Sequence, residues 1–233
     1  MKKVIFFPLA FLIMLLSIIP IIFAWLFFFY KPAKRFFIRV GSLFIARAII
    51  LSSFNTVEVK GLNRLKKVEK NALFVSNHQS MFDIVLITAY IPKIIGYVAK
   101  KELFKIPILS FWMSLFGCIS IKRENIKEAK VVIEKGIKKL KNGENLLVFP
   151  EGTRSRSNNM KKFKSGSFRL AKETNATIVP LTCINTSQAL NRQTKKITLI
   201  IHPVIKTNSL DEKQFLQLHK TVENIIRKGL KRG

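Results

Sequence analysis

The sequence predicts an α/β fold with a mostly parallel sheet flanked by helices, preceded by a membrane-attached hairpin of helices at the amino terminus. From residue 56 onward, short apolar strand-like runs alternate with stretches of helical periodicity, which is typical of parallel sheets covered by helices. Before that point, residues 4–30 contain no charged residue. We therefore expect membrane-anchoring helices over residues 1–55 and an α/β domain over residues 56–233.

The uncharged run of residues 4–30 would be about 40 Å long as a helix, enough to cross a hydrocarbon core about 30 Å thick. A cleavable signal peptide would have a shorter apolar region and then small residues at a cleavage site, and the end of this run, AWLFFFYKP, has none. Pro8 and Pro20 leave a kinked or re-entrant helix open beside a straight span. Residues 36–50 are too short to span and carry Arg39 and Arg47, which predicts an interfacial amphipathic helix.

The charge balance indicates a membrane partner and a cytoplasmic location. The chain has 41 Lys and Arg against 13 Asp and Glu, a net charge of +28, yet 48% of its residues are hydrophobic. Such a combination is typical of proteins on anionic lipid, and no aromatic–basic motif for nucleic acid is present. Because positive segments stay on the cytoplasmic side of a membrane, we expect the domain at the cytoplasmic face. Cys118 and Cys183 lack CxxC spacing. We therefore expect both to be free thiols that pack in the protein interior, without a disulfide or a zinc site.

The elements of the α/β domain are expected in alternating order. The strands are expected at residues 56–61, 72–77, 94–100, 118–122, 145–150, 176–182 and 196–202. The helices are expected at residues 79–91, 106–117 and 125–141, within residues 163–174, and at residues 210–230. Gly143 is expected to stop the third of these helices, and Pro180 is expected to terminate its strand.

The pair of His78 and Asp83 is the first candidate for chemistry, in the stretch NHQSMFD directly after an apolar strand. Ligands of such folds bind at the carboxyl ends of strands. Once the first helical turn forms, the carboxylate can lie beside the imidazole, fix its tautomer and leave the other ring nitrogen to accept a proton. That proton can come from a hydroxyl or from water. The alternative is a helix-capping turn around a buried histidine.

A second cluster, EGTRSRS at residues 151–157, follows another predicted strand. Arg154 can hold a phosphate by two parallel hydrogen bonds, and Gly152 lets the backbone approach a ligand closely. Glu151 can bond a hydroxyl or hold an arginine, and Arg123 beside Lys122 can add a second phosphate contact. The alternative is a solvated basic loop.

The other two histidines give no metal site. His202 and His219 have no ligand spacing to each other or to a cysteine. We expect His202 to be structural and His219 to lie on the surface of the last helix.

Taken together, four blocks resemble the 1-acyl-sn-glycerol-3-phosphate acyltransferase family of glycerolipid acyltransferases: NHQSMFD, GCISIKR, FPEGTRS and IVPL, in that order. The resemblance implies transfer of a fatty acyl group from acyl-CoA or acyl-carrier protein to the sn-2 hydroxyl of lysophosphatidate, giving phosphatidate. It implies His78 as general base, with Asp83 orienting it. It implies no metal or organic cofactor. The implied substrate-binding residues are Arg123, Glu151, Gly152, Thr153 and Arg154.

Two rival functions stay open at this point. The acceptor can be a different lysophospholipid, since the polar blocks address mainly the glycerol phosphate. The chain can also be a non-catalytic basic membrane-binding protein, although such a protein has no need of both His78 and Asp83.

Overall fold

The computed structural model describes residues 2–68, 71–121, 126–191, 193–194 and 196–231. Within these residues, seven strands form one sheet in the order β1-β7-β6-β2-β5-β3-β4. Neighbouring strands are parallel except β6 and β7, which are antiparallel. The predicted fold class is confirmed. The strands are β1 (Thr56–Lys60), β2 (Ala72–Ser76), β3 (Ile95–Lys100), β4 (Ile119–Ile121), β5 (Asn145–Val148), β6 (Thr177–Ile184) and β7 (Lys196–Ile201).

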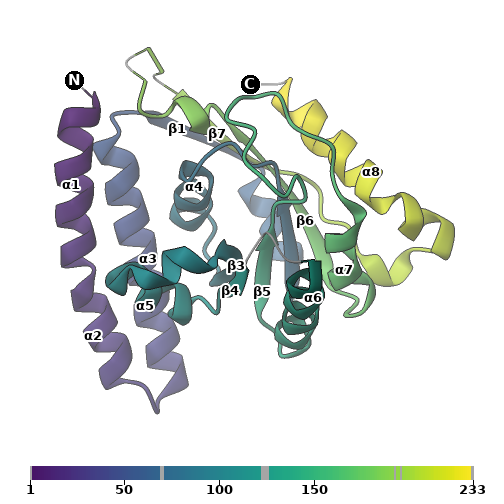
Figure 1. Cartoon of the computed structure of the whole chain (residues 1–233), viewed down its shortest axis with the longest axis horizontal. Helices are drawn as coiled ribbons and strands as arrows, with labels where there is room; N and C mark the ends of the chain where they lie inside the picture. The colour runs from purple at the N-terminus through teal and green to yellow at the C-terminus, as the bar shows by residue number, and fades with distance from the viewer. Residues whose placement is uncertain (1, 69–70, 122–125, 192, 195, 232–233) are drawn as a thin grey trace.

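Helices cover both faces of the sheet, as Figure 1 shows. The side chains of β2 alternate: Ala72 and Phe74 join the core under α3 and α4, whereas Leu73 and Val75 join the core under α6, α7 and α8. Burial on both faces explains why this strand is apolar throughout. The helices are α1 (Lys2–Leu16), α2 (Ile18–Leu26), α3 (Lys31–Ser52), α4 (Phe82–Tyr90), α5 (Pro107–Leu115), α6 (Ile126–Lys141), α7 (Arg169–Lys172) and α8 (Glu212–Leu230).

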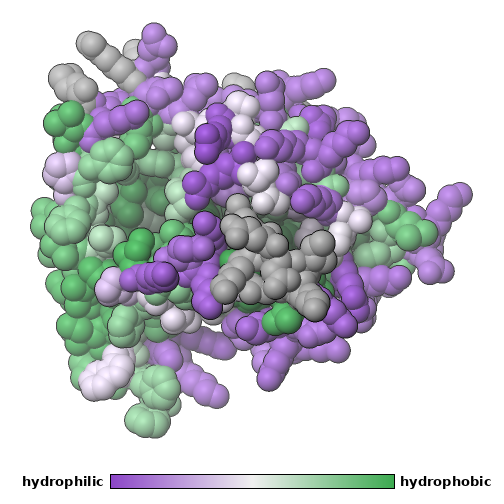
Figure 2. Space-filling view, viewed as in Figure 1, coloured by the Kyte–Doolittle hydropathy of each residue, from purple (hydrophilic) through white to green (hydrophobic). Residues whose placement is uncertain are grey.

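The apolar amino-terminal run forms two helices with a break at Ser17. Pro20 accounts for the break, because it has no N–H to donate to the carbonyl of Leu16 at the end of α1. By length and composition, residues 2–26 are apolar enough to cross a membrane. Figure 2 shows apolar side chains gathered over the side of the molecule that these helices form.

Helix α3 is longer than the expected helix at residues 36–50, because it begins at Lys31 and ends at Ser52. It also packs against protein on one side: Ala46 and Ile50 are buried in the core that contains α4, together with Phe6 of α1. Gly41 permits close packing against α2, since a Cβ at this position would lie 2.5 Å from Pro20. The proposed boundary at residue 55 falls between α3 and β1, but the helices on either side of it share one core.

Two local expectations were wrong. The helix expected from residue 79 begins at Phe82, because the N–H groups of Gln79 and Ser80 bind the side chain of Asp83 in the turn before the helix. Pro180 does not terminate its strand, since β6 continues to Ile184. The strand changes partners at Leu181, directly after Pro180: up to Leu181 it pairs with β2, and from Leu181 it pairs with β7. The carbonyl of Pro180 accepts the N–H of His202.

Candidate active site

His78 and Asp83 meet at the carboxyl end of β2, as their spacing predicts. Nδ1 of His78 lies 2.7 Å from Oδ2 of Asp83, and both side chains are buried. Asp83 is in the first turn of α4, so the turn between β2 and α4 carries the carboxylate back over the imidazole. The turn thereby sets the distance between the two groups.

The Asp83 carboxylate accepts hydrogen bonds at both oxygens. Oδ2 also accepts the backbone N–H groups of Gln79 (2.7 Å) and Ser80 (2.8 Å), and Oδ1 accepts the hydroxyl of Thr186. A carboxylate held in this way has no proton to give, so Nδ1 of His78 carries the ring proton and donates it. The arrangement leaves Nε2 of His78 as a base.

The imidazole of His78 is held flat against Phe149, which follows β5. The two rings stack with centroids 4.0 Å apart and planes 17° apart. Among the described residues, Nε2 of His78 has no hydrogen-bond partner. The ring is therefore fixed in position and tautomer while the nitrogen that can accept a proton stays unused.

Thr186 is a residue of this site that the sequence analysis missed. It follows β6, and its hydroxyl reaches Asp83 across 103 residues of sequence. The expected strand stopped at residue 182, so the polar residues after its true end were not considered. The rule that sites form at the carboxyl ends of parallel strands would have identified Thr186 had the strand end been placed correctly.

Cys183 joins the end of β6 to the His78 turn. Its backbone N–H donates to Oδ1 of Asn77 (2.8 Å), and its carbonyl accepts the side-chain amides of Asn77 (2.9 Å) and Gln79 (3.0 Å). Burial, together with the charge of Asp83, raises the pKa of the Cys183 thiol, so the thiol stays protonated. Both cysteines are free, as expected.

Glu151 lies beneath the site and holds two loops together. Its Oε1 accepts the backbone N–H of His78 (2.7 Å), and its Oε2 accepts the backbone N–H of Lys161 (2.9 Å). The side chain is 3% exposed, and burial raises its pKa while these two N–H donors oppose the rise. Its predicted contact with substrate stays a prediction, and the structure gives it this positioning role.

Replacing Glu151 by Gln should lower the free energy of unfolding by about 1–3 kcal/mol, because the amide turns one donor toward a buried N–H group. Unfolding in urea measures the change. Glu173→Gln is the matched control, since Glu173 is exposed and pairs with Arg169, a surface ion pair of little consequence. Unchanged stability of E151Q, with a raised KM alone, would show that Glu151 acts on substrate instead.

Arg154 is exposed and extends over the turn that carries His78. One of its guanidinium nitrogens lies 2.8 Å from the sulfur of Met81. The N–H of the next residue, Ser155, donates to the carbonyl of His78 (2.8 Å). Gly152 and Thr153 are exposed in the same loop, and Gly152 has a φ of +72° that favours glycine. The structure thus brings the loop of residues 151–157 against the His78 turn.

The remaining predicted residues divide into three groups. Lys122 and Arg123 lie outside the described residues. His202 is buried and bonds the hydroxyl of Thr182 (2.7 Å), as expected of a structural histidine, whereas His219 is half-buried against Phe168. Among the described residues, no cluster of three His, Cys, Asp or Glu side chains can hold a metal ion.

Comparisons with known proteins identify several relatives. The chain is 30% identical over 177 residues to the chloroplastic 1-acyl-sn-glycerol-3-phosphate acyltransferase LPAT1 of Arabidopsis thaliana, covering 72% of this chain and 49% of that protein. It is 29% identical over 179 residues to the 1-acyl-sn-glycerol-3-phosphate acyltransferase of Borreliella burgdorferi, covering 74% of this chain and 70% of that protein. The chain therefore spans about half the length of the Arabidopsis relative and most of the bacterial one.

The fold is also that of a solved structure. The crystal structure of the 1-acyl-sn-glycerophosphate acyltransferase PlsC from Thermotoga maritima matches with a TM-score of 0.81 and 24% identity, covering 100% of this chain and 97% of that one. At this identity the likeness shows a common fold.

A family model described as "Acyltransferase" matches residues 56–184. This range is more than half of the chain, and it contains His78, Asp83, Glu151 and Arg154. The chain therefore belongs to the acyltransferase family.

Proposed function

We propose that the chain transfers a fatty acyl group from an acyl thioester to the sn-2 hydroxyl of 1-acyl-sn-glycerol 3-phosphate, giving phosphatidate for phospholipid synthesis. The observation that carries this proposal is the His78–Asp83 pair, oriented with Nε2 unused and lying beside the loop that carries Arg154. The Arabidopsis and Borreliella relatives, both named 1-acyl-sn-glycerol-3-phosphate acyltransferases, support the choice of acceptor.

In the proposed mechanism, His78 is the general base. Nε2 takes the proton of the acceptor hydroxyl as the hydroxyl oxygen attacks the thioester carbonyl. The imidazolium that forms is stabilised by the negative charge of Asp83, 2.7 Å from Nδ1. A positioned general base of this kind contributes about 10²–10⁴-fold to a rate.

The second half of the reaction returns the proton. The tetrahedral intermediate collapses, the carbon–sulfur bond breaks, and the leaving thiolate takes the proton from Nε2 of His78. The new ester bond joins the acyl carbon to the acceptor oxygen, and His78 is again a neutral base. No acyl-enzyme and no metal or organic cofactor takes part, and the donor, acyl-CoA or acyl-carrier protein, is a co-substrate.

The loop after β5 is the proposed phosphate site. Arg154 offers a planar pair of donors for phosphate, and Gly152 and Thr153 present their backbone at the same surface. Arg123 and Glu151 complete the proposed set of binding residues. The lipid acceptor lies in the membrane that the apolar helices enter, with the α/β domain at the cytoplasmic face.

A thiol-release assay tests the proposed function. The full-length chain in detergent–phospholipid micelles should release thiol from acyl-CoA or acyl-carrier protein only when lysophosphatidate is present, and the lipid product should be phosphatidate. A panel of lysophospholipids with larger headgroups identifies the acceptor. Faster turnover with one of them would show that this lipid, and not lysophosphatidate, is the acceptor. Binding of acyl-CoA and lipid without any release of thiol would establish the alternative of a non-catalytic membrane-binding protein.

Replacing Arg154 by Gln should raise the KM for lysophosphatidate about 10- to 100-fold while kcat changes little, because hydrogen bonds to a charged group contribute about 1.5–3 kcal/mol. Initial rates at varied acceptor concentration measure the change. Arg169→Gln is the matched control, since Arg169 is exposed on α7 and pairs with Glu173. An equal KM in R154Q and R169Q would remove Arg154 from the phosphate site.

A further inference from the structure

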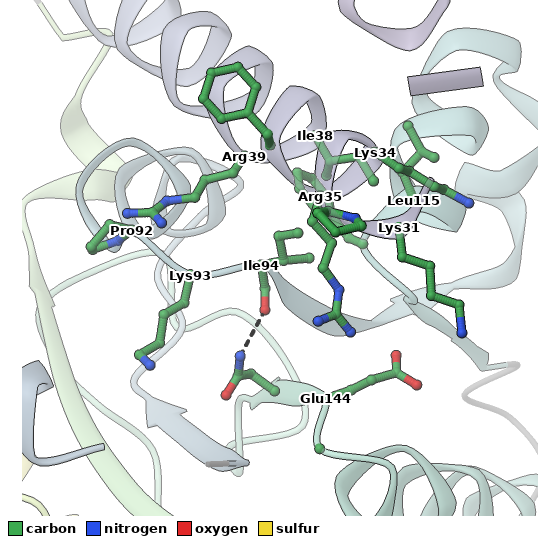
Figure 3. Close-up of a pocket in the computed structure, with 15 residues that line it drawn as sticks. Lys31, Lys34, Arg35, Ile38, Arg39, Pro92, Lys93, Ile94, Leu115 and Glu144 are labelled. Atoms are coloured by element: carbon green, nitrogen blue, oxygen red, sulfur yellow. Dashed lines mark hydrogen bonds between the residues drawn. The ribbon is translucent and has the colours of Figure 1, made fainter. Parts of the chain in front are cut away.

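A cavity lies at the opposite end of the sheet from His78, between the start of α3 and the amino-terminal ends of β3 and β5. Its volume is about 740 Å³, which is within the range of small-ligand sites. Figure 3 shows its walls: side chains of α3 on one side, the turn of residues 92–94 after α4, and Glu144 before β5.

The lining of this cavity is strongly basic. Lys31, Lys34, Arg35, Arg39 and Lys93 line it, and the acid among its lining residues is Glu144. Glu144 already pairs with Lys139 at 2.9 Å. Within the described residues, none of the five cations pairs with a carboxylate. The cavity therefore holds positive charge that the protein itself leaves uncompensated.

The positions of these cations destabilise the folded protein. Lys31, Arg35 and Arg39 recur every four residues along one side of α3, where like charges repel. Lys93 approaches from the turn after α4, where its Nζ donates to the carbonyl of Val68 (3.2 Å). Burial together with the charge of Arg39 lowers its pKa. An anion bound among these groups would relieve both the repulsion and the desolvated charge.

The surroundings of the cavity indicate that this anion belongs to a lipid. The connection between α2 and α3 exposes Phe28, Phe29 and Tyr30, with Phe29 95% exposed. Along α3, Phe36 and Phe44 are also exposed. Phe36 directly follows Arg35, and Phe44 lies two turns further along the same side of the helix as Phe36. Exposed aromatic groups beside cations are typical of a protein surface at the boundary between acyl chains and anionic headgroups.

This cavity is separate from the proposed catalytic centre. Glu144 directly precedes β5, whereas His78 follows β2, which runs parallel to β5. The two sites are thus separated by about the length of a strand, roughly 15 Å. A headgroup in the cavity does not reach the base.

We propose that the cavity binds the phosphate-bearing headgroup of an anionic phospholipid. It would be a second lipid site, in addition to the site for the acyl acceptor and separate from it. The lipid keeps its acyl chains against the exposed aromatic residues of α3 and of the α2–α3 connection. Its phosphate lies between Arg35, Arg39 and Lys93. Such a site makes the protein prefer anionic membrane at this edge, independently of whether an acceptor is bound.

The full-length chain in non-ionic detergent micelles tests the proposal, because neutral micelles lack a charged surface. Short-chain phosphatidylglycerol, phosphatidylcholine with the same chains, and inorganic phosphate are titrated separately by calorimetry. The wild type should bind phosphatidylglycerol saturably and the other two much more weakly. R35Q/R39Q should bind phosphatidylglycerol about 30-fold more weakly, since each cation contributes about fivefold at an anionic headgroup.

Matched variants separate this site from general charge and from the catalytic centre. K213Q/K220Q removes the same charge from exposed positions on α8 and should bind as the wild type does, as should R154Q. Equal affinities of R35Q/R39Q and K213Q/K220Q would overturn the cavity as the site. If inorganic phosphate bound as tightly as phosphatidylglycerol, the ligand of the cavity would be a free anion and not a lipid. If thermal unfolding shows that R35Q/R39Q is misfolded, K31Q/R35Q is used in its place, with the same expected loss of affinity for phosphatidylglycerol.

Discussion

Replacing His78 by Ala should lower kcat for acyl transfer about 10²–10⁴-fold, because the variant has no group to take the proton of the acceptor hydroxyl. Asp83 is hydrogen-bonded through Oδ2 and cannot take over this role. Nε2 of His78 has no hydrogen-bond partner among the described residues. The loss should appear as thiol release at saturating lysophosphatidate. The KM for the acceptor should change little, since Arg154 is untouched.

Two further variants make the His78 result specific. His219→Ala removes a half-buried imidazole on α8 whose ring contact is with Phe168, and it should keep wild-type turnover. His78→Gln keeps a polar side chain against Phe149, so it separates lost chemistry from lost packing. Thiol release by H78A or H78Q at the wild-type rate would exclude His78 as the base and with it the proposed mechanism.

The fold was predictable because the signals that define it are local. The central strands of the sheet, β2, β5 and β6, are mainly apolar runs followed by polar residues, and the helices between strands show their own periodicity. The His78–Asp83 contact was predictable for the same reason, since both residues belong to the short connection between β2 and α4, which brings Asp83 back to His78. The start of α4 was not predictable, because Gln79 and Ser80 use their N–H groups to bind Asp83.

The parts of the site that could not be predicted depend on contacts between distant segments. Thr186 reaches Asp83 from the far end of β6, 103 residues away, and no local pattern connects the two. Glu151 was expected to face substrate, but a sequence does not show which backbone N–H groups lie within reach of a carboxylate. The basic cavity is similar: the spacing of Lys31, Arg35 and Arg39 is visible, whereas Lys93 joins them only through the packing of α4 on α3.

Replacing Asp83 by Asn should lower kcat about 10- to 100-fold, the second large effect expected at this site, because a hydrogen bond to a charged group contributes about 1.5–3 kcal/mol. The amide has the shape of the carboxylate, and its oxygen can take the place of Oδ2 toward His78, Gln79 and Ser80. Its NH₂ group then faces the hydroxyl of Thr186, which can rotate to accept. The substitution therefore keeps the fold and the tautomer but removes the negative charge that stabilises the imidazolium.

A loss in kcat at unchanged KM distinguishes this charge effect from a disturbed binding site, and urea unfolding confirms that D83N is folded. Asp211→Asn is the matched control, because Asp211 caps α8 at an exposed position and Asn is an equally good cap. D83N with the turnover of D211N would mean that Asp83 only orients the ring. An Asp83 that merely capped α4 would show its loss in stability and not in rate, so the ratio of the two effects decides whether the buried pair is a catalytic dyad or a structural turn.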